Sequence, residues 1–121
     1  MNKEELKKRT KLYFLRIIKL CHSLPQNTAG WAISKQLIRS GTSVGANYRA
    51  VCRARSNAEF IAKIGIVVEE ADESAFWLEL IIESNLMRKD WVYPLLKETD
   101  EIISIMVASS KTVKNKIYQK S

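Results

Sequence analysis

The spacing of apolar residues over positions 33–80 constrains the fold of this chain more than any other feature of its sequence. At about 100° per residue, one apolar stripe runs over residues 33–51 and a second over residues 60–82. Between them, Ser56 precedes Glu59 by three residues, the pattern of a capping box at a helix start. Two consecutive helices with a break just before Ser56 are therefore predicted, and no stretch alternates as a strand would.

The helix predicted before this break has two unusual faces. Four cations share one line along it, namely Lys35, Arg39, Arg49 and Arg53. A separate stripe contains only small side chains, namely Ser34, Gly41, Gly45 and Cys52. Because a Gly inside a helix costs roughly 1 kcal/mol relative to Ala, the two Gly residues predict the close approach of another helix backbone.

Apolar periodicity predicts one further helix on either side of this pair. Pro25 ends the first helix and Thr28 is expected to cap the next, while Asp90 is expected to cap the last, with Pro94 in its first turn. The four helices are predicted at about residues 3–23, 29–54, 57–86 and 91–118 of a single domain that spans residues 1–121. Because short connections make neighbouring helices antiparallel, the predicted fold is all-α, an up-down-up-down four-helix bundle.

A formal net charge of +7 is the outlying feature of the composition and suggests a polyanionic partner. The bundle topology would bring the start of the first helix, the turn before Ser56 and the end of the last helix to one pole. The cations expected at this basic pole are Lys3, Lys7, Lys8, Arg9, Lys11, Arg49, Arg53, Arg55, Lys63, Lys111, Lys114, Lys116 and Lys120. The residues expected at the opposite, nearly balanced pole are Glu83, Arg88, Lys89, Asp90, Glu98, Asp100 and Glu101.

Several classes of protein are disfavoured by the sequence. No segment is apolar enough to cross a membrane and no secretory signal precedes the first helix, so a cytoplasmic protein is expected. Cys21 and Cys52 are isolated and predicted to be reduced, packed thiols. His22 stands without the Glu-x-x-His partners of a di-iron bundle, and no phosphate loop or zinc spacing occurs. We therefore expect no catalytic residues, no metal, no cofactor and no enzymatic activity.

The most specific part of the sequence is residues 34–50, SKQLIRSGTSVGANYRA. Together with Leu24-Pro25, the segment 53–56 (RARS) and the segment 69–77, it resembles the four-helix-bundle family named after proteins encoded in intervening sequences of bacterial large-subunit ribosomal RNA genes. That family includes the accessory protein of diversity-generating retroelements. The resemblance covers about residues 6–111 and implies an antiparallel bundle that assembles into a homopentamer with a basic surface. For the retroelement relative, it implies binding to RNA and to a reverse transcriptase, and it implies no enzymatic activity.

Cations at the basic pole and along the second helix are the candidate nucleic-acid contacts, because spaced Lys and Arg on a helix can follow a phosphate backbone. This candidate site contains Lys7, Lys11, Lys35, Arg49, Arg53, Arg55, Lys63 and Lys114. Arg39 and Arg53 could alternatively pair with carboxylates of the third helix or of a neighbouring subunit. For Arg39 we favour such a structural pairing, whereas for Arg49, Arg53 and Arg55 we favour nucleic acid.

The third helix carries apolar side chains among carboxylates on the side away from its core stripe. A base-stacking platform is disfavoured there because the carboxylates would repel phosphate. A subunit interface is the better interpretation, and the oligomers implied by the family resemblance agree with it. The candidate interface contains Ile66, Phe76, Trp77 and Leu80 with Arg39, Glu70 and Glu73.

Two functions from different classes remain at this point. The first is a non-catalytic, oligomeric protein that binds nucleic acid, with structured RNA preferred and DNA not excluded. The second is an interaction scaffold or accessory subunit whose basic surface docks an acidic protein partner such as a reverse transcriptase.

Overall fold

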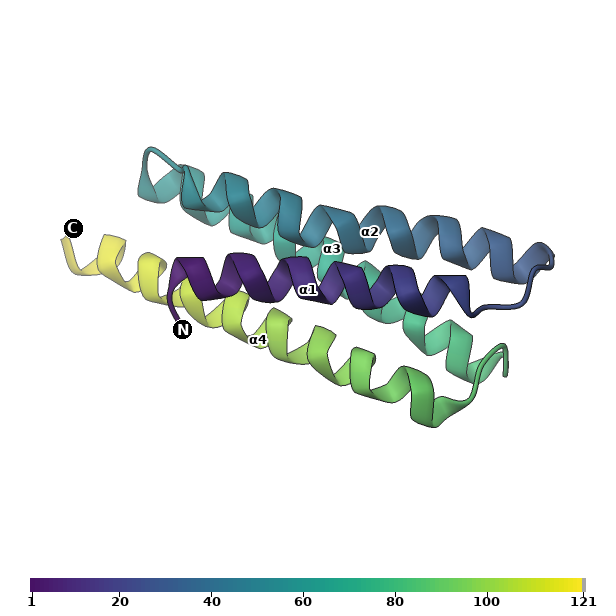
Figure 1. Ribbon diagram of the computed structural model, residues 1–121. Helices are drawn as coiled ribbons and strands as arrows, with labels where there is room; N and C mark the ends of the chain where they lie inside the picture. The colour runs from purple at the N-terminus through teal and green to yellow at the C-terminus, as the bar shows by residue number, and fades with distance from the viewer. Residues whose placement is uncertain (121) are drawn as a thin grey trace.

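Four helices form an elongated antiparallel bundle in the computed structural model, which describes residues 1–120 (Figure 1). The helices are α1 (Lys3–His22), α2 (Thr28–Cys52), α3 (Asn57–Glu83) and α4 (Lys89–Lys120). Helix α1 packs against α2 and α4, and α3 packs against the same two helices from the other side, so α1 and α3 lie diagonally opposite each other. Both termini and the α2–α3 turn lie at one end of the molecule (Figure 1). The predicted four-helix architecture is confirmed.

Side-chain caps explain where three of the helices begin. The carboxamide oxygens of Asn2 and Asn27 accept hydrogen bonds from the backbone N–H groups of Glu5 and Gly30, each at 2.8 Å. Ser56 accepts from the Glu59 N–H at 3.1 Å, as the capping-box pattern predicted. The prediction that Thr28 caps α2 was wrong by one residue, because Asn27 is the cap.

The α3–α4 connection differs from the prediction in two respects. Helix α3 ends at Glu83, three residues earlier than predicted, because Asn85 adopts a left-handed backbone conformation with φ of 58°. The N–H groups of Asn85 and Leu86 then bond the carbonyls of Ile82 and Ile81, each at 3.1 Å, which is the Schellman arrangement. Helix α4 begins at Lys89, so Asp90 lies within its first turn and does not cap it, and Pro94 lies beyond that turn.

The core is a single cluster of side chains to which all four helices contribute. Its largest fully buried members include Tyr13, Ile17, Leu37, Leu78 and Ile102. The predicted stripes supply most of this core, except that Ile81 is fully buried while the predicted Ile82 is only partly buried. Among the helices that the structure describes, none carries a stretch long and apolar enough to span a membrane.

The two Gly residues of the small-residue stripe face α1. A Cβ added at Gly41 would lie 2.5 Å from Cδ1 of Ile17, and one at Gly45 would lie 3.4 Å from Oγ1 of Thr10. The predicted close packing is therefore present on this stripe. At Gly41 the nearest neighbour is a side chain of α1, not its backbone as predicted.

A buried polar cluster joins the helices inside the apolar core. The Tyr13 hydroxyl of α1 and the Thr99 hydroxyl of α4 are 2.6 Å apart. Because Thr99 donates its own proton to the Leu95 carbonyl at 2.8 Å, Tyr13 is the donor of this pair. Also within the core, Ser74 of α3 donates a hydrogen bond of 2.8 Å to Ser40 of α2. Every helix thus contributes a bonded hydroxyl, and the bonds favour one register of packing.

Candidate nucleic-acid interface

A basic groove of about 360 Å³ runs between α1 and α2, and we call it the α1–α2 groove. Helix α1 supplies Lys7, Lys11 and Phe14 to it, and α2 supplies Thr42 and Arg49. The α1 residues are three or four positions apart and the two α2 residues are seven apart, so each set forms one stripe of its helix. Because α2 presents Thr42, Gly45 and Ala46 here, no bulky side chain closes the space between the lysines of α1 and Arg49. Glu4, Lys8 and Thr10 complete the lining.

The cations of this groove differ in how strongly they are already paired. Lys7 contacts Glu4 at 3.2 Å on the same helix. Lys11 and Arg49 are exposed, and none of the ion pairs in the described part of the chain involves either of them. Both are therefore available to an anionic ligand without breaking an internal contact.

The remaining residues of the predicted nucleic-acid site lie at different distances from this groove. Arg53 is the C-cap of α2 and Arg55 lies in the α2–α3 turn, so both extend the line of Arg49 at the same pole. Lys63 pairs with Glu59 at 2.8 Å on α3. Lys35 lies on α2 fourteen residues before Arg49, about 21 Å along the helix. The structure therefore groups Lys7, Lys11, Arg49, Arg53 and Arg55, and separates Lys35 from them.

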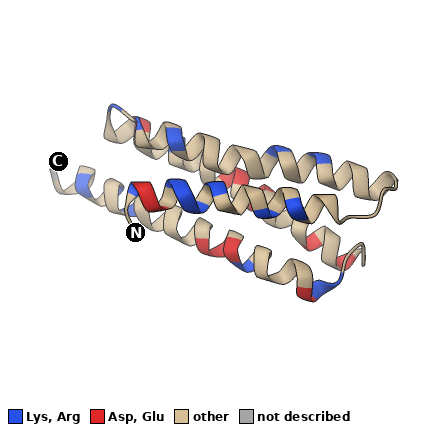
Figure 2. Ribbon diagram, viewed as in Figure 1, with Lys and Arg blue, Asp and Glu red and all other residues tan. Residues whose placement is uncertain are grey.

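The C-terminal end of α4 completes the basic pole. Lys111, Lys114 and Lys116 are exposed on the last turns of α4. The side chain of Lys120, which was also predicted here, lies outside what the structure describes. These lysines add charge to the same end of the molecule as the α1–α2 groove (Figure 2).

One part of the predicted charge map was wrong. Arg9 was assigned to the basic pole, and Glu98 and Glu101 to the opposite one, but Arg9 contacts Glu98 at 2.6 Å and Glu101 at 2.7 Å. Helix α4, with 32 residues, is longer than α1, with 20, so its middle lies beside the start of α1. The hydrogen bond from Arg9 lowers the pKa of Glu98 despite partial burial. Arg9 is therefore a structural cation that joins α1 to α4.

Charge is segregated by helix as well as by pole (Figure 2). Helix α1 carries seven Lys and Arg against two Glu, and α2 carries three cations and no acidic residue. Helix α3 carries seven acidic residues against one Lys. Because α1 and α3 lie diagonally opposite, one side of the bundle is basic and the other is acidic.

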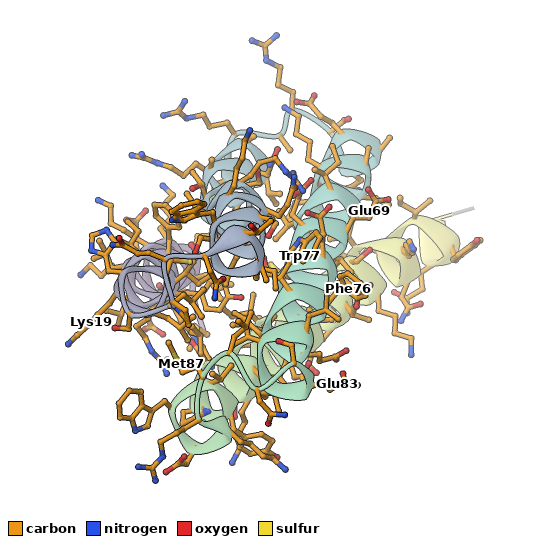
Figure 3. The ribbon with its side chains drawn as sticks, turned by 90° about the vertical axis from the view of Figure 1, so that its right-hand side faces the viewer. Lys19, Glu69, Phe76, Trp77, Glu83 and Met87 are labelled. Atoms are coloured by element: carbon orange, nitrogen blue, oxygen red, sulfur yellow. The ribbon has the colours of Figure 1, made fainter. Side chains whose placement is uncertain are left out.

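Arg39 joins α2 to the acidic helix within a single chain. Its guanidinium contacts Glu70 at 3.3 Å and also pairs with Glu73. The indole N–H of Trp77 donates to the same Glu73 carboxylate at 3.2 Å. Figure 3 shows Trp77 directed toward α2, and its ring is partly buried against the core. Four residues of the predicted interface, namely Arg39, Glu70, Glu73 and Trp77, thus form one cluster on the α2–α3 seam.

The remaining predicted interface residues lie on the outer side of α3. Phe76 is 50 % exposed and Ile66 is 42 % exposed, while Leu80 is partly buried. Figure 3 shows Phe76 pointing away from the bundle on the same side as Glu69 and Glu83. Gly65 also faces open space, since a Cβ added there would meet nothing within 4 Å. We call this surface, formed by Gly65, Ile66, Glu69, Phe76 and Leu80, the α3 outer face.

Some exposed side chains were missed by the periodicity argument. Leu12 and Leu15 of α1 are 59 % and 55 % exposed, and Trp91 at the start of α4 is 61 % exposed. All three lie off the apolar stripes of their helices, which was the signal available in the sequence. Contiguous exposed apolar side chains mark surfaces that a partner can cover, whereas single ones are ordinary.

The chemistry offered by this surface is charge and apolar contact. Cys21 is buried, which raises its pKa to about 11, and Cys52 is partly buried. His22 is exposed at the end of α1. Within the described residues, no three His, Cys, Asp or Glu side chains gather where they could hold a metal ion.

Comparisons with known proteins agree with the fold and the sequence motif. A crystal structure of a protein of unknown function from the S23 ribosomal protein family of Bacteroides thetaiotaomicron VPI-5482 is similar to this chain, with a TM-score of 0.84 and 32 % sequence identity. The similarity covers 92 % of this chain and 99 % of that one. No curated protein matches the chain. The model of the family described as 23S rRNA-intervening sequence protein matches residues 2–108, which confirms the resemblance drawn from the sequence. This chain therefore belongs to the 23S rRNA-intervening sequence protein family.

Proposed function

We propose that this protein is a non-catalytic, oligomeric nucleic-acid-binding protein that contacts structured RNA through the α1–α2 groove and the α2–α3 turn. The observation that carries this proposal is the convergence of unpaired cations from separate elements. Lys11 from α1, Arg49 from α2 and Arg55 from the turn lie at one pole and are exposed. Phosphate contacts by such cations release counterions, and this release drives binding without base recognition.

Self-association is the second part of the proposal. The α3 outer face combines exposed apolar side chains with carboxylates, so two such faces would repel each other across a two-fold axis. The outer side of α1 is complementary to the α3 outer face, because Leu12 and Leu15 are exposed there among the lysines of that helix. A contact between opposite sides of the bundle is head-to-tail, and such contacts produce closed rings when the rotation closes. A ring of five, which the family resemblance implied, would repeat the basic pole and make binding multivalent.

The test of nucleic-acid binding is a charge reversal in the α1–α2 groove. Fluorescence anisotropy of wild type against a structured RNA should give a linear decrease of log affinity with log salt, with a slope that reports several phosphate contacts. Arg49→Glu should weaken binding and reduce that slope by about one contact or more. Reversal of Arg49, Arg53 and Arg55 together should abolish binding.

The matched control is Lys97→Glu, which changes the net charge equally on an exposed lysine of α4 outside the α1–α2 groove. Equal losses in Arg49→Glu and Lys97→Glu would mean that only net charge matters and would remove the groove from the proposal. If the triple reversal left RNA affinity intact but abolished co-purification with an acidic protein such as a reverse transcriptase, the scaffold function would replace this one.

A further inference from the structure

A second cationic surface, which no motif indicated, lies at the pole opposite the termini. Two grooves meet there at Trp91, one of about 310 Å³ between α1 and α4 and one of about 670 Å³ beside the α3–α4 turn. Ser23, Met87 and Trp91 line both grooves. We call this surface the Trp91 site.

Cations line both grooves and carboxylates line neither. Arg16 and Lys19 of α1 line the smaller groove, and Arg88 and Lys89 line the larger one. The nearby Asp90 is held by Arg88 through a contact of 2.9 Å and lines neither groove. Glu98 and Glu101, which the sequence analysis placed at this pole, pair with Arg9 instead. The site therefore favours an anion.

The aromatic part of the site is the exposed side chain of Trp91. The Trp91 side chain is 61 % exposed, and the Arg88 guanidinium lies 5.8 Å from its ring centroid, within cation–π range. Leu20, Met87 and Leu95 give the smaller groove an apolar floor next to the indole. An exposed indole flanked by cations on an apolar floor is the arrangement that binds stacked bases and their phosphates.

We propose that the Trp91 site binds an unpaired nucleotide of a single-stranded nucleic-acid segment. Its base stacks on the Trp91 indole, and its flanking phosphates contact Arg16 and Lys19 on one side and Lys89 on the other. This inference rests on the proposed nucleic-acid function but assigns a separate site at the other end of the bundle. A duplex has no free base to stack, so the site selects single strands, whereas the α1–α2 groove accepts any phosphate backbone. An acidic peptide is disfavoured because its side chains would neutralise the cations and leave the indole uncovered.

The test compares two equally exposed tryptophans. Trp31 is 63 % exposed on α2 and lines neither groove, so Trp31→Ala is the matched control for Trp91→Ala. Binding of a short oligo(dT) strand and of a duplex of equal length is measured by anisotropy at one salt concentration. Trp91→Ala should lower the affinity for the single strand about fivefold or more and leave the affinity for the duplex unchanged. Trp91→Phe should retain most of the affinity but lose the quenching of tryptophan fluorescence by oligo(dT).

Each outcome separates this site from the α1–α2 groove. Equal single-strand affinity in Trp91→Ala and Trp31→Ala would overturn the Trp91 site and leave the groove proposal standing. If Arg49→Glu kept normal duplex affinity while Trp91→Ala lost single-strand affinity, the α1–α2 groove would be excluded as a binding site and the Trp91 site would be supported. Quenching of Trp91 by a poly-glutamate peptide to the same extent as by oligo(dT) would overturn the stacking assignment.

Discussion

Tyr13 is a buried phenol whose hydroxyl is used within the core. Burial raises the pKa of Tyr13 to about 12, against the opposing effect of its hydrogen bonds to Thr99 and Ser74. Because this pKa lies above the value of an unfolded tyrosine, about 10, the folded state holds the proton more tightly. The resulting stability is fully present below about pH 10 and is lost as the pH rises through about 12. Tyr13 thus makes the bundle sensitive to alkali.

Replacement of Tyr13 by Phe should have two measurable effects. At neutral pH the variant should lose about 1–2 kcal/mol of unfolding free energy, because the hydrogen bond from the Tyr13 hydroxyl to Thr99 is absent. The hydrogen bond from Thr99 to the Leu95 carbonyl remains. Between pH 10 and 12 its stability should decline less steeply than that of wild type. Urea titrations followed by circular dichroism at pH 8 and pH 11 measure both, with Tyr93→Phe as the exposed control. A variant as sensitive to alkali as wild type would exclude Tyr13 as the responsible group.

At the scale of the element, the α1–α2 contact depends on the absence of a side chain at Gly41. An added Cβ would lie 2.5 Å from Cδ1 of Ile17, whose side chain is fully buried in the core. Overpacking of a core costs about 1–3 kcal/mol, which exceeds the gain of about 1 kcal/mol in helix propensity. The seam between α1 and α2 is therefore set by steric fit.

We expect Gly41→Ala and Gly65→Ala to change stability in opposite directions. Gly41→Ala should lower the melting temperature because Ile17 must move. Gly65→Ala should raise the stability of the isolated chain by up to about 1 kcal/mol, because a Cβ there meets nothing within 4 Å. Thermal denaturation at low protein concentration checks both. A Gly41→Ala variant with unchanged stability would contradict the close packing at Ile17.

At the scale of the whole molecule, the segregation of charge between α1 and α3 favours a head-to-tail assembly. Trp77 is a poor probe of that assembly, because its ring packs on the core and its N–H bonds Glu73, so a change there would also affect folding. Phe76 is a better probe, since it is 50 % exposed and points away from the bundle (Figure 3).

Phe76→Glu should dissociate the proposed oligomer, because it places a charge in the apolar part of the α3 outer face and adds repulsion between carboxylates. The mass of wild type by multi-angle light scattering should be a multiple of 13.9 kDa, and that of Phe76→Glu should approach 13.9 kDa. Tyr93→Glu, at an aromatic residue of similar exposure on α4, is the control and should keep the wild-type mass. A wild-type mass of one chain would refute the assembly, and an unchanged mass for Phe76→Glu would exclude this face.

Local physics determined what the sequence alone could predict. Helical periodicity, the Ser56 cap and the short connections depend on interactions within a few residues, so the four helices and their antiparallel order could be predicted. The errors of one to three residues arose at Thr28, because Asn27 caps α2, and beyond Glu83, because the left-handed Asn85 ends α3. At Asp90 the error arose because α4 begins one residue before it, at Lys89.

Long-range geometry determined the rest. The sequence shows which cations are present, but only the unequal helix lengths bring Arg9 to Glu98, and only the packing of α1 on small residues of α2 opens the groove beside Lys11 and Arg49. Trp91 becomes a candidate site only when α1 brings its cations beside it. The sequence by itself determined the helices and their charges, because those follow from adjacent residues. The tertiary structure decided which charges are paired and which remain available, because that depends on residues distant in the chain.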